Sequence, residues 1–348
     1  MSLAKALPTE DLDLVLAHTG ELWRQMRGER VFIAGGTGFF GCWLLESFLH
    51  ANERENLGAR VTVLTRNPAA FQQKSPHLAS DPAVTLLAGD VRDFAFPEGD
   101  FRYVIHAATE SFARQVPTSQ RDLLTTITGG TERMLQFAAT HGASNFLLTS
   151  SGAVYGKQPS DQTHIPESYL GAPDPLEVSS AYGEGKRLAE QLCALYASES
   201  QMECKIARCF AFVGPHLPLN AHFAIGNFIG DVLAGRPIRI QGDGTPERSY
   251  LYAADLAIWL WTILMRGASL RAYNVGSDQS VSIAELALLT VEALKRQTAI
   301  EVMGKPNPDT PISRYVPSTR RAQEELGLWQ HIPLKEAIRR TAAWHLAP

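Results

Sequence analysis

The sequence lacks the features that mark disulfide-rich, metal-binding, nucleic-acid-binding or membrane-spanning proteins. Only four cysteines occur among 348 residues, without a C-x-x-C pair, which favours reduced thiols over a disulfide framework or a zinc site. The formal net charge is −4, and no basic run is present that could follow a phosphate backbone, so we expect no nucleic-acid partner. No apolar run is long enough for a membrane span, and the N-terminus is acidic where a signal peptide is basic. We therefore expect a cytoplasmic protein with no membrane partner and no metal.

One stretch, residues 31–41, combines an apolar run with closely spaced glycines, and an amphipathic run follows it. This pattern predicts a buried strand, a tight turn and a helix whose N-terminus faces the turn. Glycines let the backbone approach a pyrophosphate, and helix N-terminal amides suit its charge. The spacing Gly35-x-x-Gly38-x-x-Gly41 differs from the common G-x-G-x-x-G. Because a second strand is predicted at residues 60–65, at βαβ distance, we predict a dinucleotide site.

The rest of the N-terminal half alternates short apolar strands with helical segments. Strands are predicted at residues 83–91, 103–109 and 145–151, and a helix at 125–141. Such alternation predicts an α/β fold of the Rossmann-like type, with a doubly wound parallel sheet. Before the glycine turn, residues 1–28 predict an amphipathic helical extension with Thr9 as its N-cap and a break at Gly20.

The end of the strand at residues 60–65 bears on the choice of cofactor. In dinucleotide folds an acidic side chain here binds the ribose, whereas an arginine accommodates a 2′-phosphate. Thr65 stands in place of the acid and Arg66 follows it. The cofactor is therefore NAD or NADP, and Arg66 favours NADP.

Two elements carry catalytic chemistry. Ser151 ends a strand, and Tyr182 and Lys186 lie four residues apart at the start of a predicted helix, so they share one helix face. A tyrosine with a pKa of about 10 is a poor base at neutral pH, and we expect the Lys186 ammonium to lower that pKa. Proton exchange with a substrate hydroxyl then becomes feasible, with Ser151 hydrogen-bonded to the same oxygen and a nicotinamide carrying the hydride.

Taken together, these motifs resemble the extended short-chain dehydrogenase/reductase family, also called the NAD-dependent epimerase/dehydratase family. The resemblance runs from about residue 31 to about 330 and rests on G-G-T-G-F-F-G (35–41), G-D-V (89–91), H-A-A (106–108), S-S-G-A-V-Y-G (150–156), Y-G-E-G-K (182–186), V-G-P (213–215), R-S-Y-L-Y-A-A-D-L (248–256) and Y-N-V-G-S (273–277). Members mostly act on nucleotide-diphosphate sugars, and many are homodimers formed through the Tyr-Lys helix and its predecessor. The resemblance implies that Ser151, Tyr182 and Lys186 are the catalytic triad.

The resemblance also implies binding residues. Asp90 is expected against the adenine, Arg248 on the substrate diphosphate and Asn227 on the substrate, and an arginine fork suits a diphosphate. Glu110 and Ser111 follow a strand end where relatives place substrate contacts. The full set implied for the cofactor is Gly35, Thr37, Gly38, Phe39, Phe40, Gly41, Arg66, Asp90, Val91, Ala107, Ala108, Tyr182 and Lys186, and for the substrate Glu110, Ser111, Ser151, Asn227 and Arg248.

Two departures from the family pattern narrow the reaction. Gly152 and Ala153 stand where 4,6-dehydratases carry an Asp-Glu pair, and UDP-glucuronate decarboxylases keep a Glu at the position of Ala153. Dehydration and decarboxylation are therefore disfavoured, and the small residues are closer to the 4-epimerases. Ala211 and Phe212 replace the asparagine usually found near the substrate diphosphate. Either Arg248 and Asn227 compensate, or the substrate is not the usual sugar nucleotide.

The predicted function is that of an NAD(P)-dependent nucleotide-sugar epimerase or oxidoreductase that transfers a hydride at a sugar carbinol, most simply C4. Two alternatives stay open: an NADPH-dependent 4-ketosugar reductase, favoured by Arg66, and a non-catalytic dinucleotide-binding regulator, whose usual mark is loss of the Tyr or Lys. We expect a cofactor domain over residues 29–212 and 248–271, and a substrate lobe over 213–247 and 272–348. The nucleotide and the sugar stay open.

Overall fold

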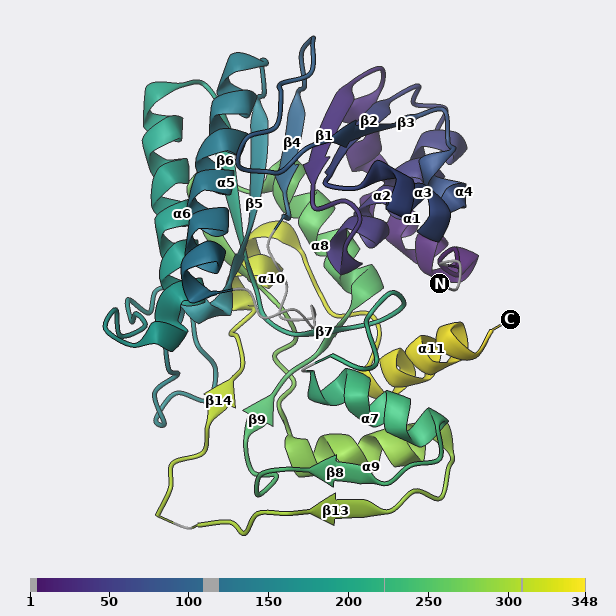
Figure 1. Ribbon diagram of the computed structural model, residues 1–348, viewed down its shortest axis with the longest axis vertical. Helices are drawn as coiled ribbons and strands as arrows, with labels where there is room; N and C mark the ends of the chain where they lie inside the picture. The colour runs from purple at the N-terminus through teal and green to yellow at the C-terminus, as the bar shows by residue number, and fades with distance from the viewer. Residues whose placement is uncertain (1–4, 109–118, 222, 308, 348) are drawn as a thin grey trace.

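The fold is built on one parallel sheet with helices on both faces. The computed structural model describes residues 5–108, 119–221, 223–307 and 309–347. The seven strands of the sheet pair in parallel in the order β11-β6-β5-β4-β1-β2-β3. They are β1 (Arg30–Ala34), β2 (Arg60–Thr65), β3 (Val84–Ala88), β4 (Tyr103–His106), β5 (Asn145–Ser151), β6 (Glu203–Cys209) and β11 (Ala272–Val275). The predicted Rossmann-like α/β fold is confirmed (Figure 1).

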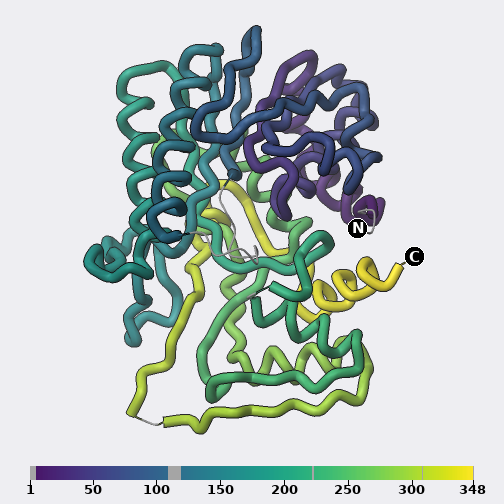
Figure 2. The backbone as a smooth tube through the Cα atoms, in the orientation of Figure 1, coloured from purple at the N-terminus to yellow at the C-terminus, as the bar shows by residue number. Residues whose placement is uncertain are grey.

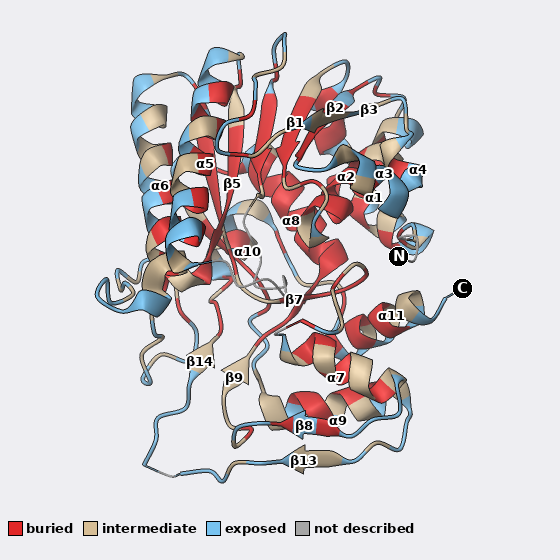
Figure 3. Cartoon of the chain, viewed as in Figure 1, coloured by how far each residue is buried: buried red, intermediate tan, exposed pale blue. Residues whose placement is uncertain are grey.

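The inner strands contribute side chains to two separate cores, because successive side chains point to opposite faces. On β1, Val31 and Ile33 pack in one core, while Phe32 packs in the other. The first core is covered by α1 (Thr9–Trp23), α2 (Phe39–Arg54) and α8 (Ala253–Arg266), and the second by α5 (Gln120–Thr140) and α6 (Ala181–Glu199). Figure 3 shows the inner strands of the sheet and α8 buried, and α5 and α6 exposed along their outer faces. Shorter helical elements are η1 (Arg24–Met26), α3 (Pro68–Lys74), α4 (Pro76–Ala79), η2 (Gly152–Tyr155), η3 (Val178–Ser180) and α10 (Arg320–Leu326).

A smaller lobe lies against the carboxyl ends of the sheet strands (Figures 1 and 2). It is built from paired strands β8 and β13, the three-stranded sheet β12-β9-β14, and three helices. Strands β7 and β10 form a further parallel pair beside it. The bounds are β7 (Phe212–Val213), α7 (Ala224–Leu233), β8 (Ile238–Ile240), β9 (Glu247–Arg248), β10 (Leu251–Tyr252), β12 (Val281–Ser282), α9 (Ile283–Leu294), β13 (Ile300–Val302), β14 (Arg314–Tyr315) and α11 (Leu334–Leu346).

Two predicted boundaries need correction. The cofactor domain was expected to resume at residue 248, but Arg248 lies on β9 in the three-stranded sheet of the lobe. We expected the substrate lobe to resume at residue 272, but β11 (Ala272–Val275) pairs with β6 at the edge of the main sheet. The reason is that its side chains Tyr273 and Val275 are buried in the main core, on the face of the sheet that α8 covers. The sheet therefore ends after residue 275, and the lobe resumes beyond it.

The N-terminal extension packs on the main domain but differs in detail from the prediction. The helix α1 begins at Thr9 after Pro8, so Thr9 is not its N-cap, and it continues through Gly20 as far as Trp23. The cost of a mid-helix glycine is about 1 kcal/mol, which the burial of Trp23 outweighs. Asp11 on this helix is buried, accepts a hydrogen bond of 2.6 Å from Tyr252 and pairs with Arg340 of α11. The extension thus ties the C-terminal helix to the main domain.

The sheet has its topological switch point between β1 and β4. From β1 the chain proceeds through β2 and β3 in one direction, and from β4 through β5 and β6 in the other. In such sheets ligands bind at the carboxyl ends of the strands where the order reverses. In the described part of the chain, no helix combines the length and the apolarity that crossing a membrane requires.

Candidate active site

A large cavity opens at the switch point, between the sheet and the smaller lobe. Its volume is about 1710 Å³, and its walls include the glycine turn after β1, the ends of β4 and β5, the start of α6, and Arg248 and Tyr315 from the lobe. Pockets for a single small ligand usually measure about 300–1,000 Å³. The cavity is therefore large enough for a dinucleotide together with a second ligand.

The glycine turn shows which of its glycines the fold itself requires. A Cβ on Gly35, whose φ is +86°, would meet the Ala107 backbone at 2.5 Å, and one on Gly41 would meet the Gly35 carbonyl oxygen at 2.3 Å. A Cβ on Gly38 would meet only the Gly35 oxygen, at 3.5 Å, which is ordinary contact. Gly38 is the N-cap of α2 and lines the cavity. Packing within the chain does not require a glycine at position 38. A ligand phosphate that approaches the helix N-terminus would favour one, because it leaves room for the close approach of the phosphate to the backbone.

The next wall contains the residues predicted for the adenosine half of the cofactor. Asp90 and Arg66 both line the cavity. Arg92 donates to Asp90 in bidentate fashion, at 2.8 and 3.1 Å, and this pairing lowers the pKa of Asp90, with a smaller contribution from the charge of Arg66. Asp90 is thus held as a carboxylate, and Arg66 supplies the positive charge next to it. Arg92 was not predicted from the sequence.

The remaining residues predicted for the cofactor lie around this turn. Thr37, Phe39, Phe40, Val91, Ala107 and Ala108 all line the cavity. Gly41 does not, because it packs behind the turn against Gly35. The ring of Phe40 contacts that of Phe212 edge to face, with centroids 5.1 Å apart, so the cofactor helix and the strand β7 meet at this wall.

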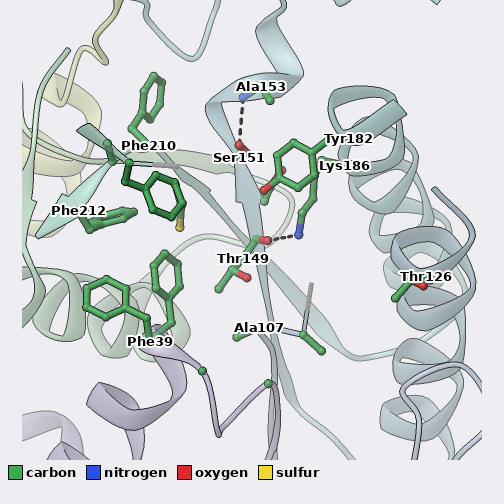
Figure 4. Close-up of a pocket in the computed structure, with 18 of the residues that line it drawn as sticks. Phe39, Ala107, Thr126, Thr149, Ser151, Ala153, Tyr182, Lys186, Phe210 and Phe212 are labelled. Carbon is green, nitrogen blue, oxygen red and sulfur yellow. Dashed lines mark hydrogen bonds between the residues drawn. The ribbon is translucent and has the colours of Figure 1, made fainter. Parts of the chain in front are cut away.

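The predicted catalytic residues converge on one wall, as Figure 4 shows. Ser151 is the last residue of β5, and its Oγ accepts a hydrogen bond of 3.2 Å from the backbone of Ala153. Tyr182 and Lys186 project from the first turns of α6, and all three side chains line the cavity. The Lys186 Nζ donates to the Thr149 carbonyl oxygen at 2.7 Å and lies 5.9 Å from the centroid of the Tyr182 ring.

The electrostatics of this triad differ from the prediction. Burial raises the pKa of Tyr182 to about 12, and the group that lowers it is Ser151, through a hydrogen bond. Burial also lowers the pKa of Lys186 to about 8. The pKa of Tyr182 is therefore raised, whereas we expected it to be lowered.

The residues predicted for the substrate are divided among three places. Arg248 lines the main cavity, and its Nη1 is anchored by the carbonyl oxygens of Glu247 and Ser313, at 2.7 and 3.0 Å. Asn227 on α7 lines a second cavity of about 520 Å³ instead; the two cavities share Ala224 and Ile283 in their walls. Glu110 and Ser111 lie outside the described residues.

Tyr315 also belongs to this site, and it was not among the residues predicted from the sequence. Its hydroxyl lies 3.4 Å from the Ser151 Oγ, and its ring packs on Phe210 with centroids 4.6 Å apart. A Cβ on Gly152 would meet the Phe210 ring at 2.7 Å and the Tyr315 hydroxyl at 2.8 Å. Tyr315 and Phe210 therefore occupy the space that a side chain at position 152 would need, which accounts for the missing acid. No motif marks Tyr315, because it lies on a two-residue strand far from the other site residues in sequence.

A comparison with known proteins places the chain in a family. Residues 31–276 match the sequence profile of the NAD dependent epimerase/dehydratase family. UDP-glucuronic acid decarboxylase 6 of Arabidopsis thaliana is 31% identical over 312 residues, covering 89% of this chain and 86% of that protein. UDP-glucuronic acid decarboxylase 1 of Xenopus tropicalis is 29% identical over 90% of this chain and 71% of its own length. The chain belongs to the NAD dependent epimerase/dehydratase family, and the predicted resemblance is confirmed.

Solved structures support the same fold. The UDP-glucose 4-epimerase of Thermotoga maritima superposes with a TM-score of 0.74 over 91% of this chain and 98% of that one, at 21% identity. The dTDP-glucose 4,6-dehydratase of Streptomyces venezuelae, solved with NAD, gives 0.74 over 91% of this chain and 96% of that one, at 22% identity. At these identities the likeness establishes the fold, and the reaction is argued below from the site.

Proposed function

We propose that the chain is a nucleotide-sugar epimerase that transfers a hydride at a sugar carbinol, C4 in the simplest case, with Tyr182 as general acid and base. The observation that carries this proposal is the convergence of Ser151, Tyr182 and Lys186 on one wall of a cavity that also contains the glycine turn. Membership of the NAD dependent epimerase/dehydratase family supports it.

The proposed chemistry follows from where these side chains lie. Ser151 and Tyr182 present two hydroxyls to the cavity, which suits a hydrogen bond to the carbinol oxygen and removal of its proton by Tyr182. The dinucleotide, when bound, accepts and returns a hydride. Lys186, with a pKa of about 8 and fixed to the Thr149 carbonyl, is the nearby group that can hold or release a proton close to neutral pH. Return of the hydride to the other face of the sugar inverts its configuration.

The residues of the main cavity also suggest where each ligand binds. Gly38 and the N-terminus of α2 are proposed to hold the pyrophosphate, and Asp90 and Arg66 the adenosine end. Arg248, with Nη1 anchored by two carbonyl oxygens, is proposed for the diphosphate of a nucleotide sugar. Structural neighbours have been solved with UDP-glucose, in one case together with NAD, which is consistent with this division. The role of Asn227 would require the substrate to extend into the second cavity.

A 4-ketosugar reductase is the second candidate, and Arg66 is the observation that favours it. Its cation lines the cavity beside Asp90 and suits the 2′-phosphate of NADPH, the cofactor that a reductase consumes. The presence of both Tyr182 and Lys186 speaks against the third possibility, a non-catalytic regulator.

Decarboxylation is a further possibility, because the curated relatives described above are UDP-glucuronic acid decarboxylases. The site argues against transferring that activity. Ala153 supplies no acid, and Phe210 and Tyr315 fill the space beside Gly152. We therefore do not expect this chain to catalyse decarboxylation or dehydration.

The chain is also proposed to form a homodimer through α5 and α6. These helices pack side by side, and their outer faces expose Leu124, Leu188 and Leu195 at 37%, 47% and 47% of their maximal area. Exposed leucines on two adjacent helices are consistent with a contact between two copies.

An assay on a panel of substrates tests the proposal. Purified protein is incubated with UDP-glucose, UDP-N-acetylglucosamine, UDP-glucuronate and a dTDP-4-keto-6-deoxysugar, each with NAD⁺, NADH and NADPH. The epimerase reading predicts a C4 epimer at unchanged mass without net cofactor consumption. Stoichiometric NADPH oxidation with the ketosugar would favour the reductase, and release of carbon dioxide from UDP-glucuronate would overturn the expectation against decarboxylation.

A further inference from the structure

The Ser151 hydroxyl has three partners, two of which are phenols. Its Oγ accepts from the Ala153 N–H at 3.2 Å, is hydrogen-bonded to Tyr182 and lies 3.4 Å from the Tyr315 hydroxyl. The last distance is long for a hydrogen bond between hydroxyls, but catalytic hydrogen bonds are commonly long in ligand-free sites and shorten in the complex. Tyr182 comes from α6 and Tyr315 from the lobe, so the serine joins the two parts of the site.

The number of protons available restricts how these groups can bond. A serine hydroxyl has one proton to donate and two lone pairs to accept with. The Ala153 N–H occupies one lone pair, which leaves one lone pair and one proton for the two phenols. One phenol must therefore donate to Ser151 while Ser151 donates to the other. The three hydroxyls form a chain with a direction.

A fourth group allows this direction to reverse. The Tyr315 hydroxyl lies 3.5 Å from the Cys209 carbonyl oxygen, about as far as it lies from Ser151. When Tyr315 donates to Ser151, the serine proton points to Tyr182. When Tyr315 turns to the Cys209 carbonyl, Tyr182 can donate to Ser151 and Ser151 to Tyr315. The reversal is a rotation of hydroxyl groups, in which no covalent O–H bond breaks.

The surroundings hold the Tyr315 ring in place for this role. The ring packs on Phe210, and its strand β14 pairs with β9, in a register that puts Tyr315 opposite Arg248. The neighbouring Arg314 forms an ion pair of 2.8 Å with Glu247 on β9. The ring of Tyr315 is thus held while its hydroxyl proton can turn, and removal of that hydroxyl leaves these contacts of the ring intact.

We propose that Tyr315 is a positioning residue for the catalytic serine: its hydroxyl directs the Ser151 proton toward the Tyr182 oxygen whenever that oxygen has given up its own proton. A hydroxyl that accepts a hydrogen bond becomes a stronger donor, so Ser151 supported by Tyr315 stabilises the phenolate better than Ser151 alone. The catalytic meaning of this arrangement rests on the proposed function, whereas the hydrogen-bond chain itself does not.

The first test therefore uses no substrate. Tetranitromethane nitrates tyrosine through its phenolate, so the nitration rate of Tyr182, followed by peptide mass mapping at mildly alkaline pH, reports how readily Tyr182 ionises. Tyr315→Phe is expected to slow nitration of Tyr182 at least fivefold, and Ser151→Ala at least as much. Adding Tyr315→Phe to Ser151→Ala is expected to change nothing further, because Tyr315 acts through the serine.

The matched control is Tyr155→Phe. Tyr155 is also a buried phenol whose ring lies beside Phe210, but its hydroxyl donates to Asn274, at 2.7 Å. This variant is expected to lose stability without changing the nitration of Tyr182. A rate within twofold of wild type in Tyr315→Phe, or further slowing in the double variant, overturns the proposal.

Activity gives a second readout once a substrate of the panel is turned over. Tyr315→Phe is expected to lower kcat at pH 7 about tenfold with KM unchanged, and to move the acidic limb of the pH profile upward by about one unit. A change in KM alone, with the limb in place, overturns the positioning role. If no substrate of the panel reacts, the proposed function fails while the nitration experiment still decides the role of Tyr315.

Discussion

Replacing glycines of the turn after β1 separates what the fold needs from what a cofactor needs. In Gly35→Ala the new methyl group meets the Ala107 backbone at 2.5 Å, and φ at this position is +86°. The left-handed conformation costs about 1–2 kcal/mol and the forced backbone shift about 1–3 kcal/mol more. We expect unfolding free energy to fall by about 2–5 kcal/mol.

Gly38→Ala is the contrasting change. Its methyl group meets only the Gly35 oxygen, at 3.5 Å, and the backbone at φ −88°, ψ −174° suits any residue. Stability should change by no more than about 1 kcal/mol, the usual cost of alanine at an N-cap. Because the methyl group points into the space proposed for the pyrophosphate, we expect dinucleotide affinity to fall at least tenfold.

Thermal unfolding and fluorescence titration with NAD⁺ and NADPH check both variants. The account predicts that Gly35→Ala loses stability and that Gly38→Ala loses affinity at near-native stability. A Gly38→Ala protein that binds both dinucleotides as tightly as wild type would refute the assignment of this turn to the cofactor.

Three further predictions concern stability, cofactor choice and assembly. Burial raises the pKa of the Asp255 carboxyl to about 7, so the stability that it contributes is present at acidic pH and is lost as the pH rises through 7. Denaturant unfolding should show a free energy of unfolding that is roughly 2–4 kcal/mol lower at about pH 8 than at about pH 5, and Asp255→Asn should abolish this difference. Equal pH dependence in both proteins would contradict this. Arg66→Ala should weaken NADPH binding about tenfold in titrations and leave the affinity for NADH unchanged. Arg60→Ala, at the other end of β2, is the control. Equal losses of affinity for both cofactors would remove the argument for NADP. Leu188→Glu on α6 should convert a dimer to a monomer in native mass spectrometry. Leu288→Glu on α9, where the leucine is 62% exposed, should leave the dimer intact. A dimer that survives Leu188→Glu must form through another surface.

The parts of the site that could be predicted are those encoded within a short stretch of chain. The glycine turn, the position of Ser151 at a strand end and the four-residue spacing of Tyr182 and Lys186 depend on local geometry, and the structure brings them to one cavity. The Asp90 region was also predictable, although its partner Arg92, two residues away, was overlooked.

The parts that could not be predicted depend on long-range packing. Tyr315 reaches Ser151 because β14 pairs with β9, and a two-residue strand has no periodicity to detect. The return of β11 to the main sheet depends on a free edge beside β6. The pKa of Tyr182 moved opposite to expectation because burial, which spacing cannot measure, outweighs the hydrogen bond with Ser151.

Transfer of an isotopic label tests the central claim most directly. Nucleotide sugars deuterated at C4 are incubated with the protein and with NAD⁺ or NADP⁺, and the cofactor recovered after rapid denaturation is analysed by mass spectrometry. The account predicts one deuterium in the reduced nicotinamide with the wild-type protein and none with Tyr182→Phe. Because an epimerase returns the deuterium to C4, the product carries it there in either case; conversion of the substrate with no deuterium in the recovered cofactor at any time point would contradict hydride transfer at this carbon.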